Sequence, residues 1–273
     1  MMIISTLFVM VNLQGRAQEK FSLGYKLEKG KTYKYVQDNN VESTQEMGGQ
    51  EMKMNASVHL IMKYEVEEVS KEGSITLVSS YDEAKVQMKG MGRDTTMDMK
   101  NMTGKKTTNE IAKNGKTIKE ISKDTAKHSR SLMSLDGFTY TKFVVLPEMP
   151  VGIGEKWTKT ASDTNKSDEG QIVYKRNTEY TLVGKEKKGN HECLKIDLKG
   201  TVEVTGTMKQ MSMDMVMEGN GDSSGTFWFD PASGLMIEQQ NISSLEMTLA
   251  LIGQSQMTIP ISQKVTTTEK ILE

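Results

Sequence analysis

The residues best suited to chemistry are few and widely spaced. The chain of 273 residues holds one cysteine and three histidines, His59, His128 and His191. Cys193 follows His191 by two positions, which in a strand places both on one face without a third group to orient the imidazole. A buried structural cysteine is the more common occupant of such a position. Motifs for a nucleophilic serine, a catalytic zinc or a phosphate-binding loop are absent from the sequence. We therefore expect a protein that is not an enzyme and that uses no cofactor.

Methionine is the second chemical signal. The chain contains 22 methionines, and several recur at every second position, which in a strand points the whole set to one face. Mostly polar residues lie between them and would face water. We expect these methionines to line an apolar face of the sheet as a ligand-binding surface: Met52, Met54, Met97, Met99, Met211, Met213, Met215 and Met217.

Three interpretations of this face remain open. Methionine can fill a plain hydrophobic core, because its flexible side chain fits irregular space. An uncovered face would instead form an adaptable groove for an apolar ligand such as a lipid or an acyl chain. Thioethers also bind Cu(I) and Ag(I), and the spacing of Met208, Met211 and Met213 predicts a soft-metal site as the alternative. No histidine, cysteine or aromatic residue lies beside these three to complete such a site.

Apolar residues that alternate with polar ones predict the strands that carry these side chains. Every second residue from Val58 to Val66 and from Leu245 to Leu251 is apolar. One buried and one wet face is typical of antiparallel sheet. Turn signals separate the strands, and the Asn114-Gly115 pair is the strongest of them. We expect one short helix over residues 124–135.

The chain also resembles itself when it is shifted by 116 positions. Residues 64–99 share eight identities with residues 180–215, including a Met-Asp-Met run, which indicates an internal duplication. The predicted halves are residues 18–140 and 141–273. Each half, with roughly five or six strands, is too small to close a barrel of about eight strands. We therefore expect an all-β fold of two tandem curved antiparallel sheets, that is, duplicated half-barrels.

The first residues are typical of a secretory signal peptide. Residues 3–13 are largely apolar, and small residues precede a cleavage position after Ala17, although no lysine or arginine comes before the apolar run. The run is too short to span a bilayer, and no other stretch approaches the required length. We expect residues 1–17 to be removed and the mature chain to be periplasmic or extracellular, without a transmembrane span.

The charge balance excludes one class of partner. The chain has 35 Lys and Arg against 36 Asp and Glu, a net charge of -1, whereas a nucleic-acid partner requires a basic surface. The single cysteine also excludes a disulfide framework. The partners that remain are an apolar small molecule or a protein of the cell envelope.

Two segments carry a resemblance to known proteins. Residues 146–157 (LPEMPVGIGEKW) and 225–235 (GTFWFDPASGL) resemble segments of uncharacterised exported proteins of Gram-negative bacteria. This sequence has Glu155 where that family is expected to carry aspartate. The resemblance implies no established activity. At the level of the fold alone, a curved sheet with a small helix is similar to the periplasmic lipoprotein-carrier proteins, which hold acyl chains in a half-barrel.

The main hypothesis is therefore an exported, non-enzymatic protein that binds an apolar ligand or an envelope partner on a methionine-lined concave sheet face. The first alternative is a periplasmic protein that binds Cu(I) or Ag(I) through methionine thioethers. The second is a structural or docking protein of the envelope, which would have a dry and filled interior.

Overall fold

The computed structural model describes residues 19–90, 93–100, 102–124, 143–167, 170–210, 213–252 and 257–272. The predicted signal peptide (1–17), nearly all of the predicted helix (124–135) and the predicted boundary between the halves lie outside these residues. No helix occurs in the described part of the chain, and none there is long and apolar enough to cross a membrane.

The described residues form fourteen β-strands, most of them long. In chain order they are β1 (Lys20–Phe21), β2 (Thr32–Met47), β3 (Gln50–Val69), β4 (Ile75–Gly90), β5 (Arg93–Asp98), β6 (Thr107–Ile111), β7 (Thr117–Lys123), β8 (Val151–Gly152), β9 (Lys156–Ser167), β10 (Gly170–Lys188), β11 (His191–Gln210), β12 (Met213–Asp230), β13 (Leu235–Ile252) and β14 (Met257–Leu272). The prediction of an all-β, antiparallel fold is confirmed.

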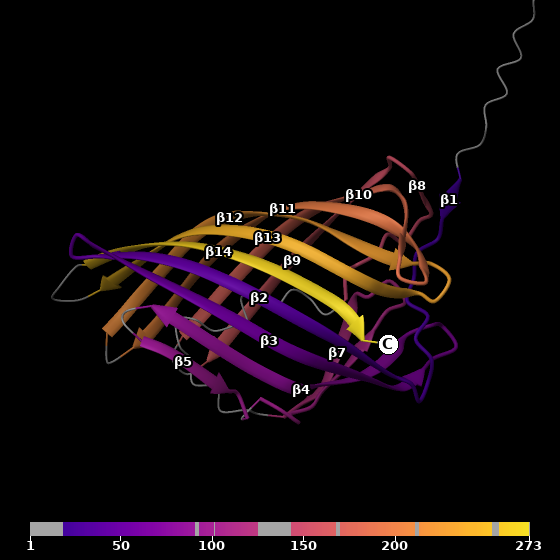
Figure 1. Ribbon diagram of the computed structural model, residues 1–273, viewed down its shortest axis with the longest axis horizontal. Coiled ribbons are helices and arrows are strands. Elements are labelled where there is room, and N and C mark those ends of the chain that lie inside the picture. Colours follow the sequence, from indigo (N-terminus) through magenta and orange to yellow (C-terminus); the bar gives the residue numbers. More distant parts are fainter. Residues whose placement is uncertain are drawn as a thin grey trace, which may run out of the picture.

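The prediction of two separate sheets is wrong. Twelve strands form one curved antiparallel sheet in the order β7-β6-β4-β3-β2-β14-β13-β12-β11-β10-β9, with β5 paired to β4 (Figure 1). The last strand, β14, pairs with β2 along most of its length, for example Thr267 with Asn39. The last and the first of the long strands are thereby joined. This pairing gives partners to backbone hydrogen-bonding groups that an open strand edge would leave unpaired. In the described residues β7 and β9 do not pair with each other, so the sheet stays open.

Glycine residues on the concave face allow the sheet to bend. Gly206, Gly219, Gly221 and Gly225 lie in the neighbouring strands β11 and β12. A Cβ atom added to Gly219 would lie 2.7 Å from the carbonyl oxygen of Glu246, and one added to Gly206 would lie 2.6 Å from that of Gln171. Adjacent strands therefore approach more closely on this face than a larger residue would permit, and the sheet curves toward it.

The predicted Asn114-Gly115 turn is confirmed, and it has a packing role. It joins β6 to β7, and Gly115 has a φ of 87°, a conformation that favours glycine. A Cβ atom at Gly115 would also lie 2.8 Å from the carbonyl oxygen of Val144. The turn is therefore pressed against two chain segments that cover one end of the concave face, 22–27 and 143–146.

One end of the concave face, here called the filled end, is occupied by the main hydrophobic core. Its completely buried side chains are Leu146, Leu182, Ile196, Phe227 and Phe229. The short sheet of β1 and β8 lies at this end of the molecule, at which β14 also finishes (Figure 1).

Two segments from outside the long strands cover the filled end. The backbone N–H of Tyr25 donates to the Lys113 carbonyl (2.8 Å), and that of Leu146 donates to the Asn114 carbonyl (2.9 Å). The Tyr25 ring packs edge-on against Phe143, with centroids 4.9 Å apart. These contacts bury aromatic surface that the sheet alone would leave in water.

Candidate functional site

The concave face changes character along the strands. Residues that pair across strands share a face, so the strand register divides the surface into rows. Beyond the filled end, several rows on β2, β14 and β13 carry buried polar side chains, and the buried pair Val41 and Val265 lies between them. We call these polar residues the polar band: Gln37, Asn39, Ser43, Gln239, Asn241, Gln263, Thr267 and Glu269.

Hydrogen bonding within the polar band is incomplete. The Asn39 side-chain oxygen accepts from the Thr267 hydroxyl (2.7 Å) and from the Gln37 amide (3.2 Å). Both polar atoms of the Asn241 side chain and Oε1 of Glu269 are buried without a hydrogen-bond partner in the described residues. Buried polar atoms of this kind are rare in native proteins, because each one loses its bonds to water.

Glu269 is the one acidic residue of the band, and its carboxyl group is mostly protonated at pH 7. Burial raises its pKa from 4.5 to about 8, because an ion is poorly solvated inside the protein. Burial also raises the pKa of Tyr35 and of Tyr64 above the ordinary value, and the charge of Glu269 raises both further. The carboxyl group therefore lies near the aromatic residues that begin the filled end.

The opposite end, here called the methionine-lined end, is apolar again. Its buried residues are Val204, Met215, Met217, Leu249 and Ile261; half-buried around them lie Ile172, Tyr174, Val202, Met208, Leu245, Met247, Leu251 and Ile259. All of these side chains come from the sheet itself, from β10 to β14. The filled end differs, because segments outside the long strands cover it.

A small cavity of about 50 Å³ lies where the polar band meets the methionine-lined end. Its lining is mixed: Tyr174, Arg176, Thr178, Thr201, Val202, Val204, Ser223, Ser243, Ser244, Leu245, Gln263 and Val265. The Arg176 guanidinium pairs with the Asp163 carboxylate and lies 5.1 Å from the Tyr174 ring centroid. The cavity therefore offers hydroxyl, amide and apolar groups, together with one positive charge that is already paired.

The structure divides the predicted methionine face. Met215 and Met217 are buried together in the methionine-lined end. Met52 and Met54 are half-buried on β3, outside that cluster. Met97 is 38% exposed, and Met99 packs against the core of the filled end. Met211 and the side chain of Met213 lie outside the described residues.

The residues of the predicted soft-metal site are described only in part. Of Met208, Met211 and Met213, only the Met208 side chain is described, and its cross-strand partner is Met215. Met217 and Met247 belong to the same cluster. In the described residues no group of three or more His, Cys, Asp or Glu side chains is arranged to hold a metal ion.

Residues 105–236 match the model of a family of unknown function (DUF6263). The matched segment contains both sequence stretches, 146–157 and 225–235, that carry the resemblance to exported proteins. No curated protein matches the chain.

Among solved structures, the similar ones include three proteins of Pseudomonas aeruginosa. OccK2 (OpdF) is 5% identical, with 89% of this chain and 99% of that chain covered and a TM-score of 0.28. OpdQ is 7% identical, with 88% and 98% covered and a TM-score of 0.23. OccK8 (OprE) is 6% identical, with 92% and 100% covered and a TM-score of 0.22.

Within the segment that matches this family model, Cys193 and His191 do not form a catalytic pair. Cys193 is buried, and burial raises its pKa to about 11, so the thiolate is scarce at neutral pH. Its Sγ faces the His191 carbonyl at 3.8 Å. The His191 ring contacts Asp230 at 2.8 Å, and Asp230 also accepts from the Ala232 N–H and the Ser233 hydroxyl. The histidine therefore helps to hold the turn between β12 and β13 through its contact with Asp230.

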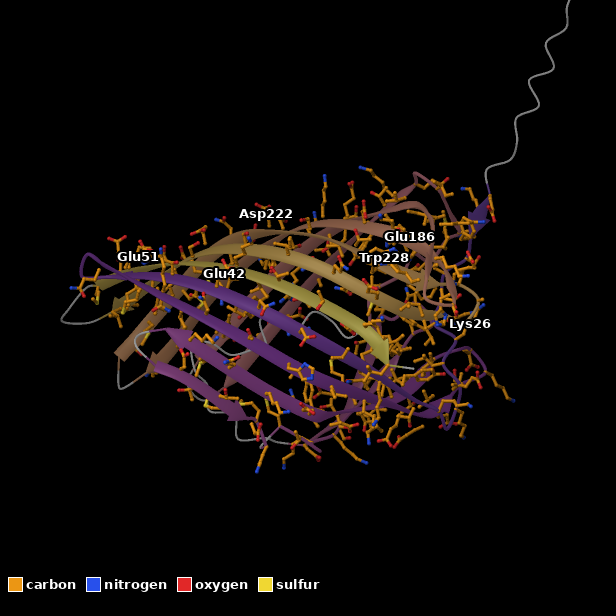
Figure 2. All side chains as sticks on the ribbon, in the orientation of Figure 1. Lys26, Glu42, Glu51, Glu186, Asp222 and Trp228 are labelled. Carbon is orange, nitrogen blue, oxygen red and sulfur yellow. The ribbon has the colours of Figure 1, made fainter. Side chains whose placement is uncertain are left out.

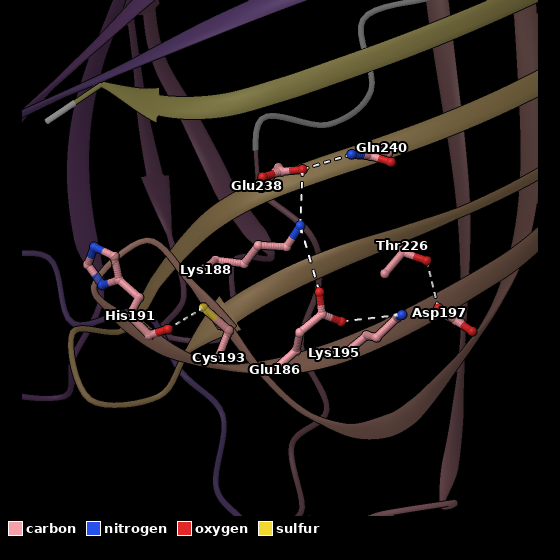
Figure 3. Close-up of polar contacts among 9 residues, drawn as sticks. All are labelled: Glu186, Lys188, His191, Cys193, Lys195, Asp197, Thr226, Glu238 and Gln240. Atoms are coloured by element: carbon pink, nitrogen blue, oxygen red, sulfur yellow. Dashed lines mark hydrogen bonds and ion pairs between the residues drawn. The ribbon is translucent and has the colours of Figure 1, made fainter.

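A charged network covers Cys193 on the outer face of the same segment (Figure 3). The Lys188 ammonium lies 3.6 Å from the Trp228 ring centroid and 3.4 Å from Glu238. The neighbouring Trp228 indole and the Lys195 ammonium, 3.3 Å from the Glu186 carboxylate, lower the pKa of Glu186. Other charged residues, such as Glu42 and Asp222, project from the outside of the sheet (Figure 2). This convex surface is highly charged, in contrast to the concave face.

The sequence did not predict the polar band. Gln37 and Asn39 alternate with Asp38 and Asn40, so both faces of β2 are polar there and the alternation does not identify the buried one. The sequence of β14 gave a weak signal, because Gln263 and Thr267 lie on the same face of the strand as the apolar Ile261 and Val265.

Proposed function

We propose that this chain is an exported binding protein that holds an apolar ligand, such as a lipid or an acyl chain, on the methionine-lined end of its concave face. One observation carries the proposal. At that end eight apolar side chains around a buried group of five are only half buried by the sheet, whereas the filled end is covered by the segments around Tyr25 and Leu146.

The energetics favour an apolar occupant of this surface. Removing apolar area from water contributes about 25 cal/mol per Å², or about 0.8 kcal/mol per methylene group. Met208, Met215, Met217 and Met247 are unbranched and have polarizable thioethers, so they adapt to ligands of different shape. An alkyl chain bound on this face would remove its apolar surface from water without requiring a rigid pocket.

Two further observations support the proposal. Residues 1–17 have the composition of a signal peptide, and an exported carrier would meet lipids of the envelope. The pKa of Cys193 is raised and His191 is engaged with Asp230, which supports binding rather than chemistry.

Binding of an alkyl series tests the proposal. We expect the affinity for primary alcohols from eight to fourteen carbons to rise about fourfold per methylene, the equivalent of about 0.8 kcal/mol. Isothermal titration or displacement of a lipophilic dye measures it. Met217→Lys should abolish binding, because it places a charge in the apolar cluster, while Glu218→Lys on the outer face should not. No binding by the folded wild type, or equal binding by both variants, would overturn the proposal.

A soft-metal site is the second candidate function, and one observation favours it. Met208 pairs directly with Met215, and Met217 and Met247 lie in the same cluster, so four thioethers are available for Cu(I) or Ag(I). Replacing Met208 and Met215 by leucine keeps the volume and removes the sulfur. Loss of Ag(I) binding with retained alcohol binding would support both functions; unchanged Ag(I) binding would exclude this site.

A further inference from the structure

The polar band contains side chains that lack the partners their burial requires. Asn241 is 2% exposed and Glu269 is 7% exposed, and three of their polar atoms have no hydrogen bond in the described residues. Each such atom costs about 1–3 kcal/mol when it is left unpaired. Native proteins pair these groups with water or with a ligand.

The neighbouring side chains do not supply the missing bonds. Thr267 pairs with Asn241 across the strands, but its hydroxyl donates to Asn39. Glu269 lies one row away, between Gln37 and Gln239. The unpaired atoms therefore lie in adjacent rows of one face.

The cavity begins at the next row of the concave face. Ser243 follows Asn241 on the same side of β13 and pairs with Ser223 and Val265, and all three line the cavity. A volume of about 50 Å³ holds roughly three or four water-sized groups. The rows beyond it, through Leu245, lead onto the methionine-lined end.

The polarity of the band selects the chemistry of the bound group. All of its members except Glu269 are uncharged, and Glu269, with a pKa of about 8, is mostly protonated at pH 7. Arg176 in the cavity is already paired with Asp163. A charged group would lose its hydration without gaining a counter-ion, whereas a hydroxyl or amide can both donate and accept.

We propose that the polar band and the adjoining cavity form a head-group site, so that the ligand is an amphiphile with an uncharged, hydroxyl- or amide-bearing head at Asn241 and Glu269 and an apolar chain on the methionine-lined end. This inference rests on the proposed function and adds the polar half of the ligand to it.

Three probes with the same dodecyl-length chain test the head-group site below their micelle concentrations at pH 6.5: monolauroylglycerol, methyl laurate and dodecyltrimethylammonium. We expect monolauroylglycerol to bind at least tenfold more tightly than either of the other two. In Asn241→Leu its affinity should fall to that of methyl laurate, and methyl laurate itself should bind as before. Gln240→Leu, the adjacent amide on the outer face, should leave the tenfold preference unchanged.

The outcomes separate the two proposals. Equal binding of all three probes would overturn the head-group site and leave the apolar-ligand function standing, whereas no binding of any probe would overturn both. Tightest binding of the cationic probe, or a preference that Asn241→Leu leaves intact, would also overturn the head-group site. A second measurement needs no variant: the dimethyl ether of monolauroylglycerol, which lacks hydroxyl donors, should lose the tenfold advantage on the wild-type protein.

Discussion

The two ends of the concave face belong to one sheet but are completed differently. At the filled end, Phe227 and Phe229 are fully buried because the segments around Tyr25 and Leu146 lie over them. At the methionine-lined end, the apolar side chains come from the sheet alone and many are half-buried. The strand pattern therefore establishes which side of the sheet is apolar. Segments distant in the chain determine whether that side becomes a covered core or an exposed surface.

The polar band separates the two ends. Buried aromatic side chains such as Phe227 and Phe229 lie on the filled side, where packing is dense. The other side carries four methionines, whose flexible side chains adapt to different shapes.

The largest effect is expected from truncation in the filled end. Phe227→Ala should lower the free energy of unfolding by about 3–5 kcal/mol, because it leaves a cavity in a closed core. Ile259→Ala, at a half-buried site of the methionine-lined end, should cost less than about 1.5 kcal/mol, because water can fill the space. Urea unfolding of both variants measures the difference, and equal losses would contradict the contrast between the ends.

Glu269 should make stability depend on pH in a defined direction. Its pKa is about 8 in the folded protein and near 4.5 in the unfolded chain, so the folded state binds the extra proton. Its stabilising contribution is complete below pH 4.5 and is lost as the pH rises to about 8, by at most about 1.4 kcal/mol per pH unit. Glu269→Gln should remove this slope between pH 5 and 8 in urea titrations; an identical slope in the variant would show that other groups cause it.

The bend that shapes the methionine-lined end should be sensitive to a single methyl group. In Gly219→Ala the new Cβ would lie 2.6 Å from the Met247 side chain and 2.7 Å from the Glu246 carbonyl oxygen, so we expect a loss of about 1–3 kcal/mol. Gly184→Ala is the matched control, since nothing lies within 4 Å of its Cβ position, and it should stay within about 0.5 kcal/mol of the wild type. Thermal unfolding would compare them, and equal shifts would argue against a steric role.

The smallest effect is expected from a volume-conserving change at the methionine-lined end. Met217→Leu should cost less than about 1.5 kcal/mol and should leave binding of long-chain alcohols within about threefold of the wild type. Titration calorimetry checks the affinity. A large loss of alcohol binding would show that the thioether itself, rather than apolar area, holds the ligand.

Much of the fold could be predicted from residues close together in sequence. The alternation through Val58–Val66 and Leu245–Leu251 predicts strands of β3 and β13, and Asn114-Gly115 predicts the turn between β6 and β7. These features depend on local geometry, because side chains alternate across a strand and glycine tolerates a positive φ. The joining of β14 to β2 could not be predicted in this way, because strand pairing depends on residues more than two hundred positions apart.

The candidate site shows the same division. Strand periodicity places Met215 and Met217 on one apolar face, and this follows from neighbouring residues alone. The burial of Asn241 and Glu269 depends instead on which strands curve around them, and only the folded chain shows it. The tertiary structure alone also separated Met99, packed in the filled end, from Met217 at the other. Local periodicity sets the direction of a side chain, but the curvature of the sheet and the segments laid across it set what that side chain meets.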